Sequence, residues 1–119
     1  MQFRERTVNG VTVIDVEGDF IVTANPGALH RAVKGALARG ERQIVLNVSG
    51  ILRMDSTCLS ELVASYRSTL ACGGALKVAA ANQGVRRLLE LTRLDTIIKP
   101  FATEAEAVAD FLGQKGATC

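Results

Sequence analysis

Apolar residues recur along this chain at two periods, one typical of strands and one typical of helices. Short apolar runs occur at residues 43–48 and 75–81. Between these runs, apolar side chains return at every third or fourth position, at residues 59, 62, 63, 66 and 70. The runs predict buried strands, and the spaced positions predict an amphipathic helix between them.

The N-terminal part of the chain predicts a hairpin followed by a helix. Phe3 to Val16 indicates two strands around Asn9-Gly10, a dipeptide that suits a type I′ turn because both positions tolerate positive φ. Pro26 falls near the first turn of the helix, and Gly40 closes it. The apolar side of this helix consists of Leu29, Ala32, Val33, Ala36 and Leu37.

Glycine, asparagine and proline divide the C-terminal half into further elements. Gly73-Gly74 ends the central helix before the strand at 75–81, and Asn82 is suited to cap the next helix. That helix buries three apolar residues, Val85, Leu88 and Leu89. Residues 96–99 predict a short strand limited by Pro100, which cannot donate a backbone hydrogen bond to a sheet.

The last element is a helix that begins at a capping box, Thr103-Glu104-Ala105-Glu106. Its expected buried residues are Ala107, Val108, Phe111 and Leu112. We expect one domain over residues 1–113 and a flexible tail at 114–119.

The order ββαβαβαβα predicts an α/β fold with a mixed, mostly parallel sheet, an N-terminal hairpin and about four helices. Ligands and partners of such sheets engage the loops at the carboxyl ends of the strands. Two segments fall at these ends, Gly18-Asp19-Phe20 and the residues from Ser49 to Thr57.

Composition and charge exclude several classes of function. The net charge of +2, an aromatic fraction of 4% and the absence of Trp disfavour direct binding of nucleic acid. No stretch approaches the ~20 apolar residues that cross a bilayer, so we expect a cytoplasmic protein without membrane insertion. Three cysteines and one histidine show no metal-ligand spacing, so neither a metal nor another cofactor is expected.

Asp55-Ser56-Thr57 places two hydroxyls at the start of the central helix. Backbone N–H groups at a helix start are free to bind a phosphate group. The same three residues also suit the plain role of capping the helix. Local spacing alone leaves both interpretations open.

Several separated motifs resemble the STAS family of bacterial anti-sigma factor antagonists over residues 5–112. After a buried strand, Asn47-Val48-Ser49 and the run from Met54 to Leu59 match the family pattern of Asp-Leu-Ser followed by Asp-Ser-Ser/Thr-Gly-Leu. Further matches are Gly18-Asp19 after the second strand, Gly73-Gly74 before a strand, and the run 85–89 that leads to Leu94-Asp95. The order and spacing of these pieces make the resemblance specific.

The resemblance implies a regulatory cycle. A kinase that is also the anti-sigma factor phosphorylates a hydroxyl at Thr57 or, as the less favoured candidate, Ser56; a phosphatase restores it, and only the unmodified antagonist captures the kinase. The implied partner-binding residues are Asp19, Phe20, Met54, Asp55, Cys58 and Leu59. The implied protein is not an enzyme.

The chain departs from the family pattern at four positions. Cys58, Ser60 and Arg93 stand where glycine is usual, and Asn47 stands where aspartate is usual. A glycine after the phosphorylated residue lets a partner backbone approach closely, so Cys58 is expected to add bulk at that contact.

Two other functions stay open. One is a cytoplasmic STAS subunit of a membrane transport complex for lipids, in which the same helix face docks without phosphorylation. The other is a thiol redox protein that uses Cys58, because the helix dipole favours a thiolate at a helix start. The oligomeric state, including a homodimer, is also open.

Overall fold

A computed structural model describes residues 2–20, 27–54, 56–98 and 100–118. The described residues form a five-stranded sheet in the order β1-β2-β3-β4-β5, in which β1 is antiparallel to β2 and the other neighbours are parallel. The strands are β1 Gln2–Val8, β2 Val11–Phe20, β3 Gln43–Met54, β4 Ala75–Ala79 and β5 Pro100–Phe101. The helices are α1 Ala28–Ala38, α2 Ser56–Ala71, α3 Gln83–Leu91, the short 3₁₀ helix η1 Leu94–Thr96, and α4 Glu104–Thr118. The predicted mixed, mostly parallel sheet is confirmed.

The N-terminal hairpin has the predicted turn. Val8 pairs with Val11, so the loop consists of Asn9 and Gly10 alone. Their φ angles are 51° and 82°, and positive φ at both positions defines a type I′ turn.

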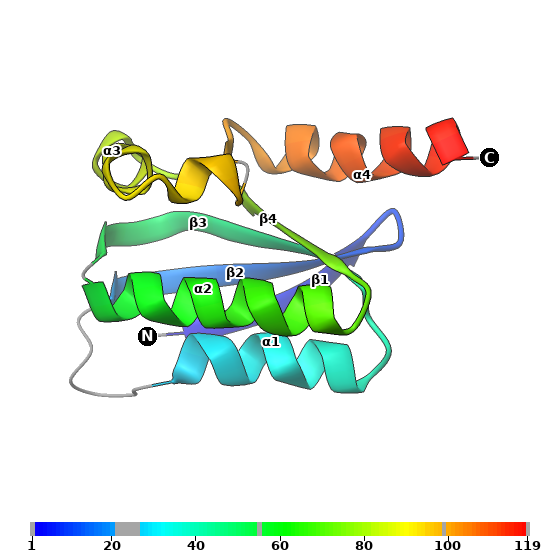
Figure 1. Cartoon of the computed structure of the whole chain (residues 1–119), viewed down its shortest axis with the longest axis horizontal. Coiled ribbons are helices and arrows are strands. Elements are labelled where there is room, and N and C mark those ends of the chain that lie inside the picture. Colours follow the sequence, from blue (N-terminus) through cyan, green and yellow to red (C-terminus); the bar gives the residue numbers. More distant parts are fainter. Residues whose placement is uncertain (1, 21–26, 55, 99, 119) are drawn as a thin grey trace.

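Helices cover both faces of the sheet (Figure 1). α1 and α2 lie side by side on one face, where alternate strand residues such as Ile14, Leu46 and Val78 contribute to the main core. α4 lies on the other face, where Val13, Val45 and Phe111 belong to a second, smaller core. Alternation along each strand therefore divides the apolar residues between two cores.

Glycines after α1 and α2 end these helices in the same way. Gly40 and Gly73 adopt positive φ angles of 92° and 81°. In α2 the N–H groups of Gly73 and Gly74 donate to the carbonyls of Leu70 and Thr69, both at 2.9 Å, which is a Schellman motif. The motif turns the chain directly into β4.

A buried lysine attaches α4 to the sheet. Lys77 of β4 is 7% exposed, and its Nζ lies 2.8 Å from Oδ2 of Asp110 on α4. The same ammonium lies 4.6 Å from the ring centroid of Phe111 and 5.4 Å from that of Phe101. A carboxylate and two aromatic faces thus offset the loss of water around a charge in this layer.

A polar cluster joins three strands to the start of α4. The guanidinium of Arg6 donates to both carboxylate oxygens of Asp15, at 2.7 and 2.8 Å, and to Oε1 of Glu104 at 2.5 Å. The side-chain amide of Asn47 donates to the same Oε1 at 2.9 Å. An aspartate in place of Asn47 would set a second carboxylate against Glu104, so the amide suits this cluster.

Three expectations for the C-terminal half need correction. The predicted strand at 96–99 is wrong: Leu94–Thr96 form η1, and the strand lies at Pro100–Phe101, paired with β4. Proline is tolerated there because it is the first residue of an edge strand. Leu112, expected to be buried, is 38% exposed, and the backbone of α4 continues to Thr118 where a tail was expected.

His30 is half-buried between α1 and α2, where its Nε2 lies 2.8 Å from Oγ of Ser68.

Replacing Gly74 with Ala is expected to destabilise the protein by about 2–3 kcal/mol. A Cβ at this position would lie 2.3 Å from the backbone oxygen of Arg42, which itself accepts a hydrogen bond from Ala75 N at 2.8 Å. Denaturant unfolding of the variant measures the loss. Gly84→Ala is the control, because a Cβ at position 84 would lie no closer than 3.4 Å to a non-neighbouring atom, Oδ1 of Asn82. Equal stability losses for the two variants would contradict the steric explanation.

Glu104→Gln is expected to reduce the dependence of stability on pH in acid. The hydrogen bond from Arg6 is the main reason that the pKa of Glu104 lies below its ordinary value of 4.5. The unfolded chain therefore binds more protons near that pH, so the contribution of Glu104 is full above pH 4.5 and is lost as the pH falls below it. Because both side chains are partly exposed, we expect a contribution of roughly 0.5–1 kcal/mol.

Unfolding free energies of the wild type and of Glu104→Gln between pH 7 and 3 test this expectation. Glu106→Gln, an exposed change in the same helix, is the control. Parallel curves for all three proteins would show that the Arg6–Glu104 pair carries no pH-dependent stability.

Candidate functional site

The ends of β2 and β3 and the start of α2 meet at one end of the sheet. Phe20 of β2 pairs with Met54 of β3, and α2 begins two residues later at Ser56. The backbone thus brings the predicted contact residues Asp19, Phe20 and Met54 close to the first turn of α2, which contains Ser56 and Thr57. Asp55, the remaining predicted residue of this loop, lies outside the described residues.

β3 is six residues longer than the strand predicted at 43–48, so most of the expected loop from Ser49 onward is strand. Gly50 falls in the segment that was expected to be a loop, but it lies within β3. The absence of a side chain there lets β2 pack closely, because a Cβ would lie 3.0 Å from Cα of Glu17 on β2. Register shifts between Asp15 and Glu17 and between Gly18 and Phe20 accompany this extension.

Asn82 joins the extended part of β3 to α3. β4 last pairs with β3 at Asn47, so beyond that residue β3 has a neighbouring strand on one side only. On the open side, the amide of Asn82 donates to the carbonyl of Ile51 at 3.0 Å. Its Oδ1 accepts from Val85 N at 2.8 Å, which confirms the predicted cap of α3.

The first turns of α2 direct some predicted contact residues into the core. Cys58 is fully buried and Leu59 is 8% exposed, whereas Ser60 is exposed. Cys58 shares the sheet-facing side of α2 with Leu62 and Ser65, at spacings of four and seven residues. The expectation that Cys58 adds bulk at a partner contact therefore needs correction: its side chain fills the core.

Glu61 connects α2 to the start of α1. This carboxylate is 8% exposed, and its Oε1 accepts from the backbone N–H of Leu29 at 3.1 Å. The N-cap of α1 is Gly27, which has no side chain to accept such a bond, so Glu61 caps α1 from another helix. Because the two partners are 32 residues apart, no local signal in the sequence indicates this contact.

An apolar groove lies between α2 and η1. It has a volume of about 320 Å³ and is lined by Leu59, Ser60, Val63, Arg67, Thr92 and Leu94. Ser60, Val63 and Arg67 follow position 56 at spacings of four, seven and eleven residues along α2. We call this feature the α2–η1 groove; no pattern in the sequence predicted it.

Arg93, beside the groove, has a left-handed backbone conformation with φ 60° and ψ 18°. Glycine adopts this conformation without strain, which agrees with the glycine that the resemblance in the sequence led us to expect at this position.

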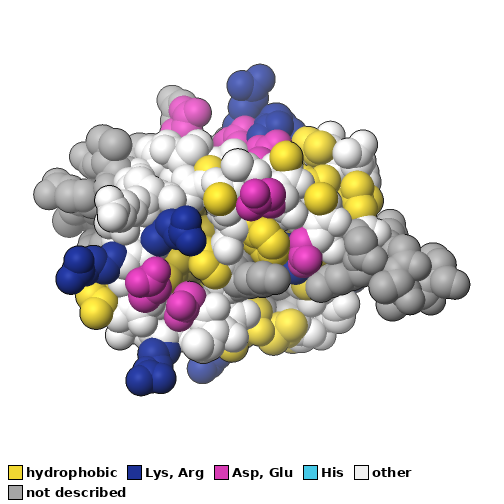
Figure 2. Space-filling model, turned by 90° about the horizontal axis from the view of Figure 1, so that it is seen from above, with side chains coloured by type: hydrophobic (Ala, Val, Ile, Leu, Met, Phe, Trp, Pro, Cys, Tyr) yellow, Lys and Arg dark blue, Asp and Glu magenta, His cyan; other side chains and the backbone are white. Residues whose placement is uncertain are grey.

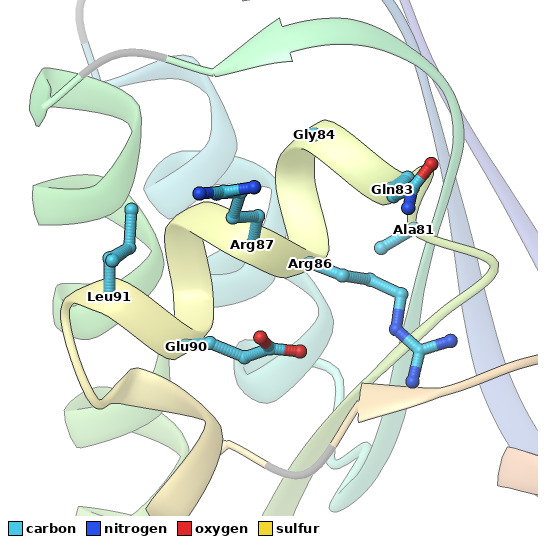
Figure 3. A pocket seen from close by; sticks show the side chains of 7 residues that line it. All are labelled: Ala81, Gln83, Gly84, Arg86, Arg87, Glu90 and Leu91. Carbon is cyan, nitrogen blue, oxygen red and sulfur yellow. The ribbon is translucent and has the colours of Figure 1, made fainter.

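α3 presents a second, broader hollow of about 1080 Å³ to solvent. Figure 3 shows its lining: Arg87 and Leu91 lie on the side of α3 that faces α2, and Arg86 and Glu90 point away from it. Leu91 is 72% exposed. Basic and apolar side chains thus occur together next to the α2–η1 groove.

Metal-ligand clusters and membrane-spanning helices are absent from the described ranges. No three His, Cys, Asp or Glu residues described by the structure could hold a metal ion together. Among the same residues, no helix has the length and the apolar character to cross a membrane.

Comparisons with known proteins identify the family. The sequence profile of the STAS domain matches residues 2–107. A candidate anti-sigma factor antagonist of Thermotoga neapolitana is 32% identical over 78 residues, which cover 66% of this chain and 69% of that protein. The chain belongs to the STAS domain family.

Solved structures agree with this assignment. An anti-sigma factor antagonist from Mycobacterium paratuberculosis has a TM-score of 0.81 and 26% identity, with 92% of each chain covered. The Bacillus cell fate determinant SpoIIAA, in its phosphorylated form, has a TM-score of 0.70 and 20% identity, with 92% of this chain and 99% of that chain covered. The fold is therefore that of STAS domains.

Glu61→Ala is expected to destabilise the protein by about 1–2 kcal/mol, because it leaves the N–H of Leu29 without its acceptor. Glu61→Gln keeps an acceptor oxygen and should lose less than half as much. Thermal unfolding and hydrogen exchange at the Leu29 amide measure both effects. Unchanged protection of this amide in Glu61→Ala would show that the hydrogen bond from Leu29 to Glu61 does not stabilise the start of α1.

Proposed function

We propose that this chain is an anti-sigma factor antagonist that acts by protein contact in the cytoplasm and catalyses no reaction. In its unphosphorylated form it binds an anti-sigma factor that is also a serine/threonine kinase. That kinase inactivates it by phosphorylating Thr57 or Ser56, and a phosphatase restores it. The observation that carries this proposal is the position of both hydroxyl residues in the first turn of α2, beside the paired ends of β2 and β3.

The start of α2 can accommodate a phosphate. A phosphate at either hydroxyl adds about −1.5 to −2 charges at neutral pH. The first N–H groups of an α-helix have no partner within the helix, and the helix dipole favours negative charge at this end. The antagonist thus tolerates the modification, whereas a partner surface that fits a neutral hydroxyl loses affinity for it.

The two hydroxyls differ in what lies one helical turn away. Position 57 precedes the buried carboxylate of Glu61 by four residues, and position 56 precedes the uncharged Ser60 by the same distance in sequence. Residues four apart on a helix are neighbours, so Glu61 would repel a phosphate on Thr57 more strongly than one on Ser56. The family resemblance favours Thr57, and this electrostatic difference keeps Ser56 in the proposal.

The proposed contact surface consists of the end of β2, the end of β3 and the start of α2. Asp19, Phe20, Met54 and Asp55 are its proposed residues around the hydroxyls, with Leu59 at its edge. SpoIIAA, which shares the fold, exists in a phosphorylated and an unphosphorylated form. We propose the same two forms for this chain.

Incubation with the anti-sigma kinase and ATP is expected to add one phosphate, which fragmentation mass spectrometry locates at residue 56 or 57. Thr57→Glu should weaken kinase binding at least about tenfold, because it places a permanent charge at the contact. Isothermal titration calorimetry measures the affinity. Thr7→Glu, the same chemical change at an exposed position on β1, is the control and should bind normally.

Normal kinase binding by both Thr57→Glu and Ser56→Glu would contradict the proposed switch. Co-purification with a membrane ATPase, independent of changes at residues 56 and 57, would instead support the transport-complex function. The thiol redox function is disfavoured because the Cys58 side chain is buried, and thiol oxidation requires access to the sulfur.

A further inference from the structure

Three exposed arginines lie at the α2–η1 groove or on the side of α3 that faces α2: Arg67, Arg87 and Arg93. Within the described ranges, none of these side chains forms an ion pair or a side-chain hydrogen bond. Other arginines are engaged: Arg6 binds two carboxylates, and Arg39 binds Glu5. The nearby acidic residues are Glu90, which is exposed, and Asp95, which is half-buried. The groove region therefore carries uncompensated positive charge.

The floor of the groove is apolar. Leu59, Val63 and Leu94 contribute aliphatic side chains, and Ser60, Arg67 and Thr92 form the polar rim. A volume of about 320 Å³ admits an apolar side chain or two from a partner, but it is small for a whole helix. On the face that carries α3 and α4, exposed hydrophobic side chains are interspersed with basic and acidic side chains and do not form one continuous apolar patch (Figure 2). The apolar surface is thus local.

Arg93 keeps a side chain where its backbone favours glycine. With φ at 60° the residue pays a conformational cost that glycine avoids. No ion pair or side-chain hydrogen bond inside the described part of the chain compensates for this cost. A contact between the exposed guanidinium and a partner molecule would account for an arginine at this strained position.

We propose that the α2–η1 groove is a docking site for an acidic protein segment. The segment places an apolar side chain among Leu59, Val63 and Leu94, and its carboxylates contact Arg67 and Arg93. Charge complementarity selects the occupant, since the unpaired guanidinium of Arg67 lines the groove and the exposed Arg93 stands between two lining residues, Thr92 and Leu94. Arg87 and the exposed Leu91 extend the same surface along α3 (Figure 3).

This site would strengthen the proposed switch. Ser60 begins the groove one turn after position 56, so a bound acidic segment would lie close to the modified hydroxyl. The same carboxylates that bind the arginines would be repelled by a phosphate at residue 56 or 57. Only the identity of the natural partner rests on the proposed function; the chemistry of the groove does not.

A synthetic peptide tests the groove without knowledge of the partner. The probe is a 14-residue helical peptide of Glu, Leu and Ala, titrated into the ¹⁵N-labelled full chain at low salt. We expect amide shift changes at residues 59–67 and 92–94, with a Kd of about 1 mM or tighter. The same peptide with Lys in place of Glu, and one with Ser in place of Leu, should bind several-fold more weakly.

Two variants separate binding from folding. Arg67→Glu should weaken peptide binding about tenfold and reduce its dependence on salt. Arg93→Gly should weaken binding about threefold while unfolding at an equal or higher temperature, because it removes both the charge and the backbone strain. Arg4→Glu, at an exposed arginine on β1, is the control and should bind as the wild type does.

Shift changes elsewhere, no shift changes, or equal binding of the acidic and basic peptides would overturn the proposal. Self-association through the groove, detected as a concentration-dependent mass that Arg67→Glu abolishes, would identify a second copy as the occupant and also overturn it. With the purified anti-sigma kinase as ligand, loss of affinity in Thr57→Glu but not in Arg67→Glu would contradict the groove as a docking site and leave the proposed function intact. Peptide binding at the groove without any binding of the kinase would support the docking site and contradict the proposed function.

Discussion

The parallel pairing of β2 with β3 is the interaction on which the candidate site depends. β3 is the central strand, and its residues from Ile44 to Asn47 pair on both sides, with β2 and with β4. Beyond Asn47 only β2 remains, and the two strands continue together to Phe20 and Met54. This extension sets where α2 begins, and α2 contains both hydroxyl residues in its first turn.

Side chains far apart in the sequence hold this arrangement. Asn82 bonds the carbonyl of Ile51 on the open side of β3, and it caps α3 with the same amide group. Glu61 bonds the start of α1 to α2. Gly50 lets β2 approach within the distance that a side chain would block. Asn82 and Glu61 thus give hydrogen-bond partners to backbone groups at helix starts and at the open side of β3, and Gly50 permits the close approach of β2 to β3.

Much of the fold could be predicted because its signals are local. The Asn9-Gly10 turn, the glycines after α1 and α2, and the cap at Asn82 all act within a few residues, and each is confirmed. The strand predicted at 96–99 was wrong because a short apolar run does not distinguish a strand from the segment after a 3₁₀ helix, in which Ile98 is buried.

The candidate site was predictable only in part. Its position followed from motif order, and the pairing of Phe20 with Met54 brings the backbones of the two segments together. The burial of Cys58 could not be read from the sequence, because it depends on the rotation of α2 against the sheet. The Glu61 cap joins residues that are 32 positions apart, and the α2–η1 groove joins residues 59–67 to residues 92–94, so no local pattern indicates them.

The central claim is that one phosphate at the start of α2 decides whether the antagonist binds its anti-sigma kinase. Native mass spectrometry of a half-phosphorylated sample mixed with a limiting amount of the kinase tests it most directly. Both forms compete for the same partner in one solution, and their masses differ by the phosphate alone. We predict that the complex contains almost only unmodified antagonist, while the phosphorylated form stays free. Equal amounts of the two forms in the complex would contradict the claim.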